Sequence, residues 1–515
     1  MRSAVLAIAL AACSPPDHGP RWRAAGNASP RDGGTLRFAT SDQVVTLDPA
    51  IEYDQISGYI VHALHDTLVG YEPGGTALVP HLAASWRVSP DGLDYTFALR
   101  DGIVFADGSP ITAESFLAAF ARVRAAADSP FQPFLANVAS VSAPDPHALA
   151  FHLAKADASF VYVLAMPFAA PHRDGSDTTS GPFVLERWDP GVRVVLRKNT
   201  RYWDAAHVHL DAIEMAENVP RDVQFLMFER GDLDTVEGLA LADYLWIQDQ
   251  PAWQPFVHVR ATLNSYGSRM NVRQKPFDDR RVRQALNYAL DKQHSVKLLG
   301  GAAIASHGIL PPGVLGRDDT LAPYPHDPAK ARELLAAAGY PGGFDIEYMI
   351  IDDDEAERLA GSLQHDLGEA GVRVHITELS IAMYAAALAS KDGPAFAKAG
   401  WIADYPDPAS FFDGCFHTRA ISDEGTTNFA FYSNPELDAL LDSARAEPDP
   451  ARRAALYRRA EHIVYDDAPW LWDYHQETVE VTQPYVRDYE PHPVWLRDYT
   501  HAWLDLDGDG ERVTR

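Results

Sequence analysis

The chain has 515 residues, a length at which a single hydrophobic core usually gives way to two or more domains. Hydrophobic residues make up 46% and charged residues 23%, the ordinary composition of a globular protein, which argues against disorder of the whole chain. The formal charge of −28 argues against a nucleic-acid binder, because such a protein needs a basic face. Two cysteines, Cys13 and Cys415, are too few for a disulfide scaffold or a thiolate zinc site.

The N-terminus has the pattern of an export signal. Basic Arg2 precedes an apolar run over residues 4–12 that is too short to span a bilayer. The run ends in Leu-Ala-Ala before Cys13, which resembles the bacterial lipobox, a signal in which the cysteine is lipidated and becomes the mature N-terminus. We therefore predict a signal peptide over residues 1–12. A lipidated tether over residues 13–31 would then hold the protein to the cell membrane.

Strand and helix patterns are intermixed along the rest of the chain. Residues 36–39, 95–99 and 192–196 are rich in strand-forming side chains or alternate between apolar and other residues, which predicts strands. Helices are predicted by capping residues followed by apolar side chains at helical spacing: after Thr112, after Asp278-Asp279, after Asp327-Pro328 and after Asn434-Pro435. This mixture indicates an α/β protein.

The sequence lacks the motifs of common catalytic and metal sites, namely G-x-S-x-G, the P-loop and H-E-x-x-H. His207-Val-His209 is a poor metal site by itself, and two surface histidines are the commoner arrangement. Asp505 to Gly510 begins like an EF-hand loop, but the given sequence stops before the bidentate glutamate, so calcium stays an alternative there. Cys415 is predicted to be a buried structural cysteine. We expect no metal and no cofactor.

Short blocks in a fixed order resemble the extracytoplasmic peptide- and nickel-binding family of ABC importers. The blocks are Leu47-Asp48-Pro49, Leu82 to Trp86, Tyr95 to Arg100, Phe105 to Ala113, Gly181 to Trp188, Asn199 to Trp203, Pro276 to Ala285 and Gly400 to Tyr405. Thr200 stands where the family usually has proline. Each block is short, but together they follow one another along nearly the whole chain after the tether.

The resemblance implies an α/β, two-lobed periplasmic-binding-protein fold of type II with an extra domain, in which discontinuous lobes are joined by a hinge. Lobe 1 would take residues 32–269, with the extra domain inserted at 52–175. Lobe 2 would take residues 270–480, and residues 481–515 would return to lobe 1. The ligand would lie in the cleft between the lobes.

The resemblance also implies how a peptide would be held. Asp404 matches the family's aspartate that holds the ligand's α-ammonium, and a carboxylate in a partly dry cleft suits that role. On its own sequence, Asp404 is equally well explained as a surface residue of a turn. Strand-like pairing with exposed main chain would hold the peptide backbone. The other expected ligand-binding residues are Gln43, Val44, Val45, Asn264, Tyr266, Gly400, Trp401, Ala403 and Tyr405.

The function implied is that of a substrate-binding lipoprotein that captures peptides outside the cytoplasm, in the periplasm, and delivers them to the permease subunits of an ABC importer. The protein would be a monomer and not an enzyme. Three alternatives stay open: the same fold with another ligand, such as a nickel chelate, a sugar or a cell-wall peptide; an exported hydrolase; and a purely structural lipoprotein.

Overall fold

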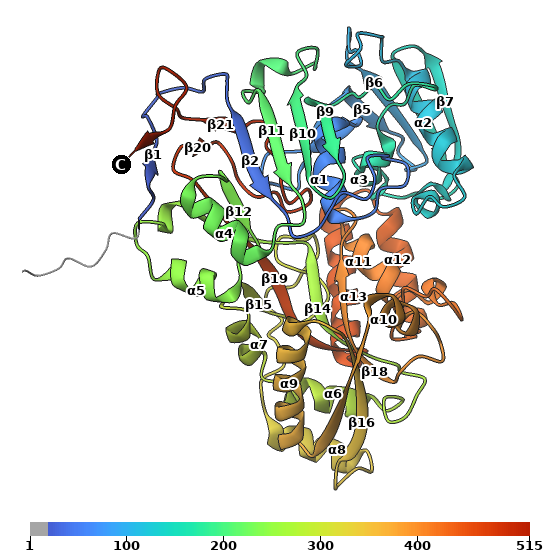
Figure 1. The fold of residues 1–515 in the computed structure, drawn as a ribbon. Coiled ribbons are helices and arrows are strands. Elements are labelled where there is room, and N and C mark those ends of the chain that lie inside the picture. Colours follow the sequence, from blue (N-terminus) through green and yellow to red (C-terminus); the bar gives the residue numbers. More distant parts are fainter. Residues whose placement is uncertain (1–18, 515) are drawn as a thin grey trace, which may run out of the picture.

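The computed structural model describes residues 19–514, so the predicted signal peptide and Cys13 lie outside the described residues. The chain forms two lobes (Figure 1). One lobe combines the N-terminal half of the chain with the C-terminal segment, and the other is built from the residues between them. Short strands β1 (Trp22–Arg23) and β22 (Val513–Thr514) pair and bring the two ends of the described chain together on lobe 1.

The central sheet of lobe 1 has the order β2-β11-β10-β9, with β2 and β11 parallel and the other pairs antiparallel. The strands are β2 (Thr35–Ala39), β11 (Ala212–Ala216), β10 (Arg193–Lys198) and β9 (Phe183–Asp189). Val194 and Leu196 of β10 are buried, as the alternation predicts, in a core shared with helix α1 (Gln55–Leu64). Near this sheet, α4 (Arg221–Arg230) and α5 (Leu241–Gln248) flank β12 (Thr235–Glu237).

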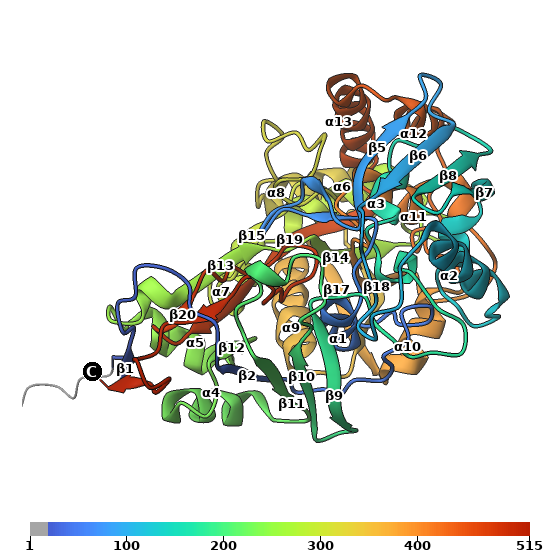
Figure 2. The same cartoon turned by 90° about the horizontal axis from the view of Figure 1, so that it is seen from above.

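An extra domain on lobe 1 has its own antiparallel sheet, which Figure 2 shows apart from the central sheet. Its order is β5-β6-β8-β7, with β5 (Ala83–Val88), β6 (Asp94–Leu99), β8 (Ala148–Leu153) and β7 (Val138–Asp145). Helix α2 (Ala113–Ala125) starts in a capping box between Thr112 and Ser115. Its Phe120 packs edge-on against Phe151 of β8, so the helix covers one face of the sheet. The hairpin β3 (Val69–Tyr71) and β4 (Leu78–Pro80) adjoins this domain.

Lobe 2 is a mixed sheet with helices on both faces. Its strands are β14 (Asn264–Met270), β18 (Phe396–Ile402), β16 (Phe344–Ile351) and β17 (Val372–Leu379). The helices that share a core with one face are α6 (Arg280–Ala289), α8 (Pro328–Ala337) and α9 (Asp354–Glu369). The helices of the other core are α11 (Pro408–Cys415), α12 (Pro435–Ala446) and α13 (Pro450–Asp467). Cys415 is fully buried there, as predicted, and is a free thiol.

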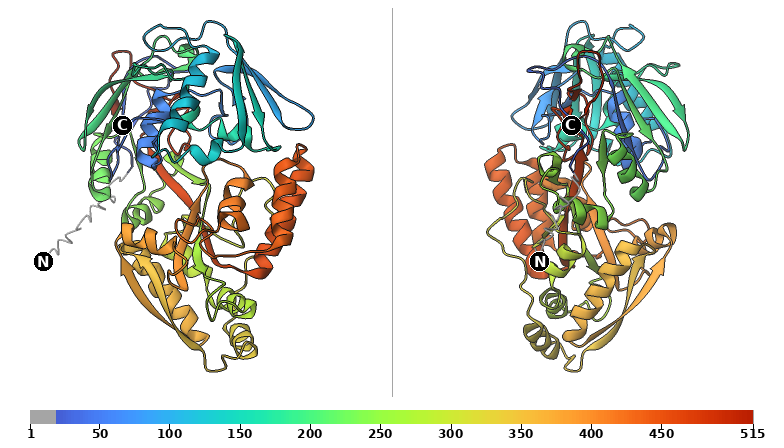
Figure 3. Two further views of the ribbon diagram at one scale, coloured as in Figure 1. Left: turned by 90° about the vertical axis from the view of Figure 1, so that its right-hand side faces the viewer. Right: turned by 60° about the vertical axis from the view of Figure 1, so that its left-hand side comes forward.

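Strand β19 (Trp470–Thr482) belongs to both lobes, and Figure 3 shows it running from one to the other. Its first half pairs with β14 and β15 (Ala303–Ala305), and its second half pairs with β12 and β13 (Val257–Ala261). The chain also passes between the lobes where β13 leads into β14. Two neighbouring strand crossings connect the lobes, which is the geometry of a hinge. No helix within residues 19–514 is long and apolar enough to cross a membrane.

Candidate functional site

Asp404 lies in the short loop that follows β18, where lobe 2 meets lobe 1. The Tyr53 hydroxyl from lobe 1 donates to Oδ1 of Asp404. The backbone N–H of Asp404 donates to Oγ of Ser410 at 3.0 Å, and this hydroxyl donates to Oδ2 of Asp404 at 3.4 Å. Burial raises the pKa of the Asp404 carboxyl. A carboxylate so placed has few donors and gains from any cationic donor that reaches it.

The loop that carries Asp404 is fixed by a buried ion pair. Asp407 accepts the backbone N–H of Ala409 and so caps α11. Arg453 of α13 binds both carboxylate oxygens of Asp407, one of them at 2.7 Å, and both side chains are almost inaccessible to solvent. Its Nε also donates to the carbonyl of Ala444 at 3.0 Å. The end of the loop that carries Asp404 is therefore held in the core of lobe 2.

Strand β18 has a free edge next to Asp404. On one side it pairs with β14 along its whole length, but on the other side it pairs with β16 only at Ala397. The Lys398 carbonyl points away from β14, because it accepts the hydroxyl of Tyr384. The N–H of Ala403 points toward β14, because it donates to Leu263 at 2.8 Å. The N–H and C=O groups of successive residues point to opposite sides of a strand. Those of Gly400 and Ile402 therefore point to the same side as the Lys398 carbonyl, which is the free edge.

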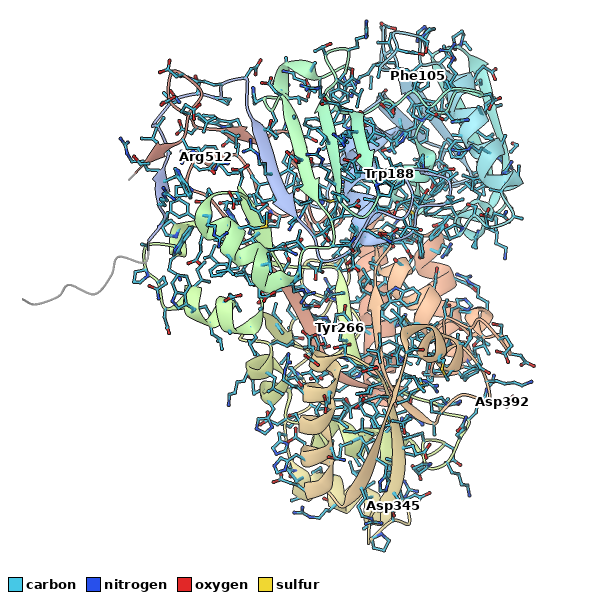
Figure 4. The ribbon with its side chains drawn as sticks, viewed as in Figure 1. Phe105, Trp188, Tyr266, Asp345, Asp392 and Arg512 are labelled. Atoms are coloured by element: carbon cyan, nitrogen blue, oxygen red, sulfur yellow. The ribbon has the colours of Figure 1, made fainter. Side chains whose placement is uncertain are left out.

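The three aromatic residues that the sequence predicts at the ligand, Tyr266, Trp401 and Tyr405, all pack against other residues of the protein. The Tyr266 ring lies against Gly400 and stacks on Tyr474 at 5.2 Å, close to the junction of the lobes (Figure 4). Trp401 packs its ring against Gly414, and its indole N–H is buried without an acceptor among the described residues. Tyr405 is buried in the core of the extra domain, with its ring 6.3 Å from that of Phe134. That contact joins lobe 2 to the extra domain.

The expected residues of lobe 1 form a loop after β2. Val44 is buried and its N–H donates to Glu217 at 3.2 Å, while the N–H of Val45 donates to Ser57 at 3.0 Å. The side chain of Val45 is 71% exposed, and Gln43 is also exposed. Because their N–H groups are satisfied within lobe 1, Val44 and Val45 have only carbonyls and side chains to offer a ligand.

Asn264 joins the two crossings between the lobes. Its amide nitrogen donates to Oγ1 of Thr262, and its amide oxygen accepts the N–H of Gln476 at 2.9 Å. Its polar atoms are thus used where β13, β14 and β19 meet. This places Asn264 at the hinge rather than on the free edge of β18.

Two residues, Tyr53 beside Asp404 and Lys398 on β18, were missed by sequence reasoning. Tyr53 carries no sequence signal, since only the fold brings it to Asp404, 351 positions away. Lys398 shares a strand face with Gly400, and a period-two argument could have found it. Its ammonium has no hydrogen-bond or ion-pair partner within residues 19–514, and burial lowers its pKa. Nearby Glu355 and Asp353 oppose that shift.

The two alternative metal sites have other contacts. His207 binds Asp204 at 2.5 Å and His209 binds Asp32 at 2.8 Å. The Asp505 carboxylate accepts the N–H groups of Gly26 and Asn27, which ties the C-terminal segment to the start of the domain. No group of three or more metal-ligating side chains is gathered anywhere in the described part of the chain.

A buried carboxyl precedes Tyr53 and makes stability depend on pH. Burial raises the pKa of Glu52 to about 7, so between its ordinary pKa of 4.5 and about 7 the folded protein holds a proton that the unfolded chain releases. Stability from this group is therefore full at low pH and is lost as pH rises. Glutamine in Glu52→Gln does not titrate, so it avoids this loss. We therefore expect the stability of the variant minus that of wild type, measured by urea denaturation, to be larger at about pH 8 than at about pH 5 by about 1–3 kcal/mol. A variant that follows wild type at both pH values would refute this.

Two lobes joined by two neighbouring strand crossings are the architecture of a two-lobed solute-binding protein. A family model described as bacterial extracellular solute-binding proteins, family 5, matches residues 77–423, and the chain belongs to this family. The predicted two-lobed fold is confirmed.

Named relatives differ in the ligand that their names give. The chain is 28% identical to heme-binding protein A of Haemophilus influenzae, over 95% of this chain and 96% of the relative. It is 29% identical to glutathione-binding protein GsiB of Escherichia coli, over 84% of this chain and 89% of the relative. The solved structure of the periplasmic binding protein DppA of Helicobacter pylori, in complex with the peptide STSA, superposes with a TM-score of 0.80. That match has 27% identity and covers 92% of this chain and 99% of DppA.

Proposed function

We propose that this protein captures short peptides for an ABC importer, holding the α-ammonium at Asp404 and the peptide backbone along β18. The observation that carries the proposal is the position of the Asp404 carboxylate at the end of the free edge of β18. The family membership and the peptide-bound relative support it. The relatives are solute-binding proteins, which supports binding rather than catalysis.

The amine end of the ligand would meet a half-buried carboxylate. A charge-assisted bond from an ammonium to a carboxylate is roughly twice as strong as a neutral hydrogen bond. An ammonium also relieves the cost of burying the Asp404 charge, which is expressed in the raised pKa of this group. A sugar offers no such cation, so Asp404 favours a ligand with an amine.

The backbone of the ligand would pair with the main-chain groups of Gly400 and Ile402, which recognise every peptide alike. At the other end of this strand edge, Lys398 offers its ammonium to a carboxylate of the ligand. Lys398 and Asp404 are six residues apart, so at about 3.3 Å per residue they are separated by no more than about 20 Å. An extended peptide of about six residues is long enough to reach both groups, whereas a shorter peptide would reach Asp404 and part of the edge.

The named ligands of the relatives can be compared with these two groups. Glutathione, the ligand in the name of GsiB, is a tripeptide derivative, and its α-ammonium is a cationic partner for Asp404. Heme has carboxylates but no amine, so it leaves Asp404 without a cationic partner. The chemistry of the site therefore favours a peptide over heme.

The proposal extends to where the protein works. Export through residues 1–12 and a lipid on Cys13 would keep the protein at the outer surface of the cell membrane, where it would act as a monomer and pass its ligand to the permease subunits. Closure of the two lobes about the β13–β14 and β19 crossings would enclose the ligand.

Native mass spectrometry tests the class of ligand. We expect protein purified under mild conditions to release peptides of about two to six residues when it is denatured. Recovery of heme, sugars or metal chelates in place of peptides would contradict the proposal.

A further inference from the structure

The Asp404 carboxylate already has a partner that the proposed ligand must replace. The Tyr53 hydroxyl donates to Oδ1 of Asp404, the oxygen on which Ser410 makes no bond. The phenol of lobe 1 thus makes with lobe 2 the same kind of contact that we propose for the α-ammonium of the ligand. The Tyr53 hydroxyl and the ammonium of the ligand cannot both donate to the same lone pairs of Oδ1 in the same geometry.

The Tyr53 side chain is placed so that it can leave. It is 58% exposed, and its ring meets that of Phe131 edge-on, with the ring centroids 5.6 Å apart. Its backbone is held more firmly, because the next residue, Asp54, caps α1 by accepting the N–H of Ser57 at 2.8 Å. Rotation of the side chain frees Asp404 and moves the hydroxyl into water without unfolding any element.

We infer that Tyr53 is a specificity-determining residue: it competes for Asp404, so that only a ligand group that binds a carboxylate more strongly than a phenol gains from this site. The inference rests on the proposed function. An α-ammonium brings a full positive charge and three donors, and its bond to a carboxylate exceeds that of a neutral hydroxyl. A ligand with a blocked or neutral end gains nothing by removing Tyr53 and leaves the phenol in place.

The competition has a measurable cost for the amine-bearing ligand. Breaking the Tyr53–Asp404 hydrogen bond uses part of the free energy of ligand binding. For a hydrogen bond to a charged group at a partly exposed position, this cost lowers the affinity a few-fold. Phenylalanine at position 53 keeps the ring and its contact with Phe131 but removes the competing donor. The free-amine ligand should then bind more tightly, while a blocked ligand should be indifferent.

Titration calorimetry with trialanine and N-acetyl-trialanine tests the inference on the purified protein, on Tyr53→Phe and on a control, Tyr340→Phe. Tyr340 is half-buried beside Phe344 in lobe 2, away from Asp404. We expect Tyr53→Phe to bind trialanine about three- to ten-fold more tightly than wild type. Its affinity for the acetylated peptide, and all affinities of the control, should stay the same.

Two kinds of result would overturn the inference. Unchanged or weaker binding of trialanine by Tyr53→Phe, including binding too weak to detect, would mean that Tyr53 does not compete. Equal tightening for both peptides would mean that Tyr53 obstructs the cleft rather than the carboxylate. Asp404→Asn, measured alongside, separates this failure from that of the proposed function: if it leaves trialanine binding unchanged, the amine anchor itself is wrong.

Discussion

Asparagine in place of Asp404 is expected to weaken the binding of a free-amine peptide by about 1.5–3 kcal/mol, the worth of a hydrogen bond to a charged group. The substitution keeps the shape of the side chain and an oxygen that can accept from Tyr53 and Ser410, but it removes the charge that attracts an ammonium. The fold of the loop should persist, because Asp407 and not Asp404 is paired with Arg453. Titration calorimetry measures the loss.

Asp392→Asn is the matched control for this change. Asp392 is an exposed acidic residue of the same lobe, and Figure 4 shows it at the outer side of that lobe, away from Tyr266. The control removes the same charge from the protein, so it tests whether net charge alone attracts the ligand. Equal losses in the two variants would assign the effect to the overall negative charge and not to Asp404.

Methionine in place of Arg453 is expected to lower the free energy of unfolding by about 3–5 kcal/mol, because it leaves the buried Asp407 carboxylate without a counter-charge. The same change removes a donor from the carbonyl of Ala444 and loosens the loop that carries Asp404. Urea denaturation measures the loss, and peptide affinity should fall with it.

The neighbouring Arg452→Met serves as the control for Arg453. Arg452 lies on the same helix and also binds a carboxylate, that of Glu447 at 2.8 Å, but its side chain is 66% exposed. Exposed pairs are screened by water, so we expect little change in stability from this substitution. Similar losses for the two arginines would show that burial of the Arg453–Asp407 pair is not what stabilises the loop.

The local elements were predictable because their signals are local. The strands expected over residues 36–39, 95–99 and 192–196 are confirmed as β2, β6 and β10, with small differences at their ends. The caps at Thr112, Asp279, Asp327 and Asn434 begin α2, α6, α8 and α12. Alternation and capping depend on a few neighbouring residues, which a single sequence contains.

The site was predictable only in part, because it is assembled across the lobes. Asp404 was found through a resemblance and not through its own chemistry, which suits a turn equally well. Tyr53 reaches Asp404 through the packing of lobe 1 against lobe 2, a long-range contact that no local pattern encodes. The free edge of β18 likewise depends on where β16 stops pairing. The expected roles of Trp401, Tyr405 and Asn264 stay predictions, and the structure adds the packing and hinge contacts of these side chains.

The measurement that tests the central claim most directly is the affinity of the wild-type protein for one short peptide with a free amine and for the same peptide N-acetylated. Both ligands have the same backbone and side chains, so their difference isolates the ammonium. We expect the acetylated peptide to bind at least about ten-fold more weakly, which corresponds to about 1.4 kcal/mol. Equal affinities would contradict the assignment of Asp404 as the amine anchor, and with it the proposed mode of peptide capture.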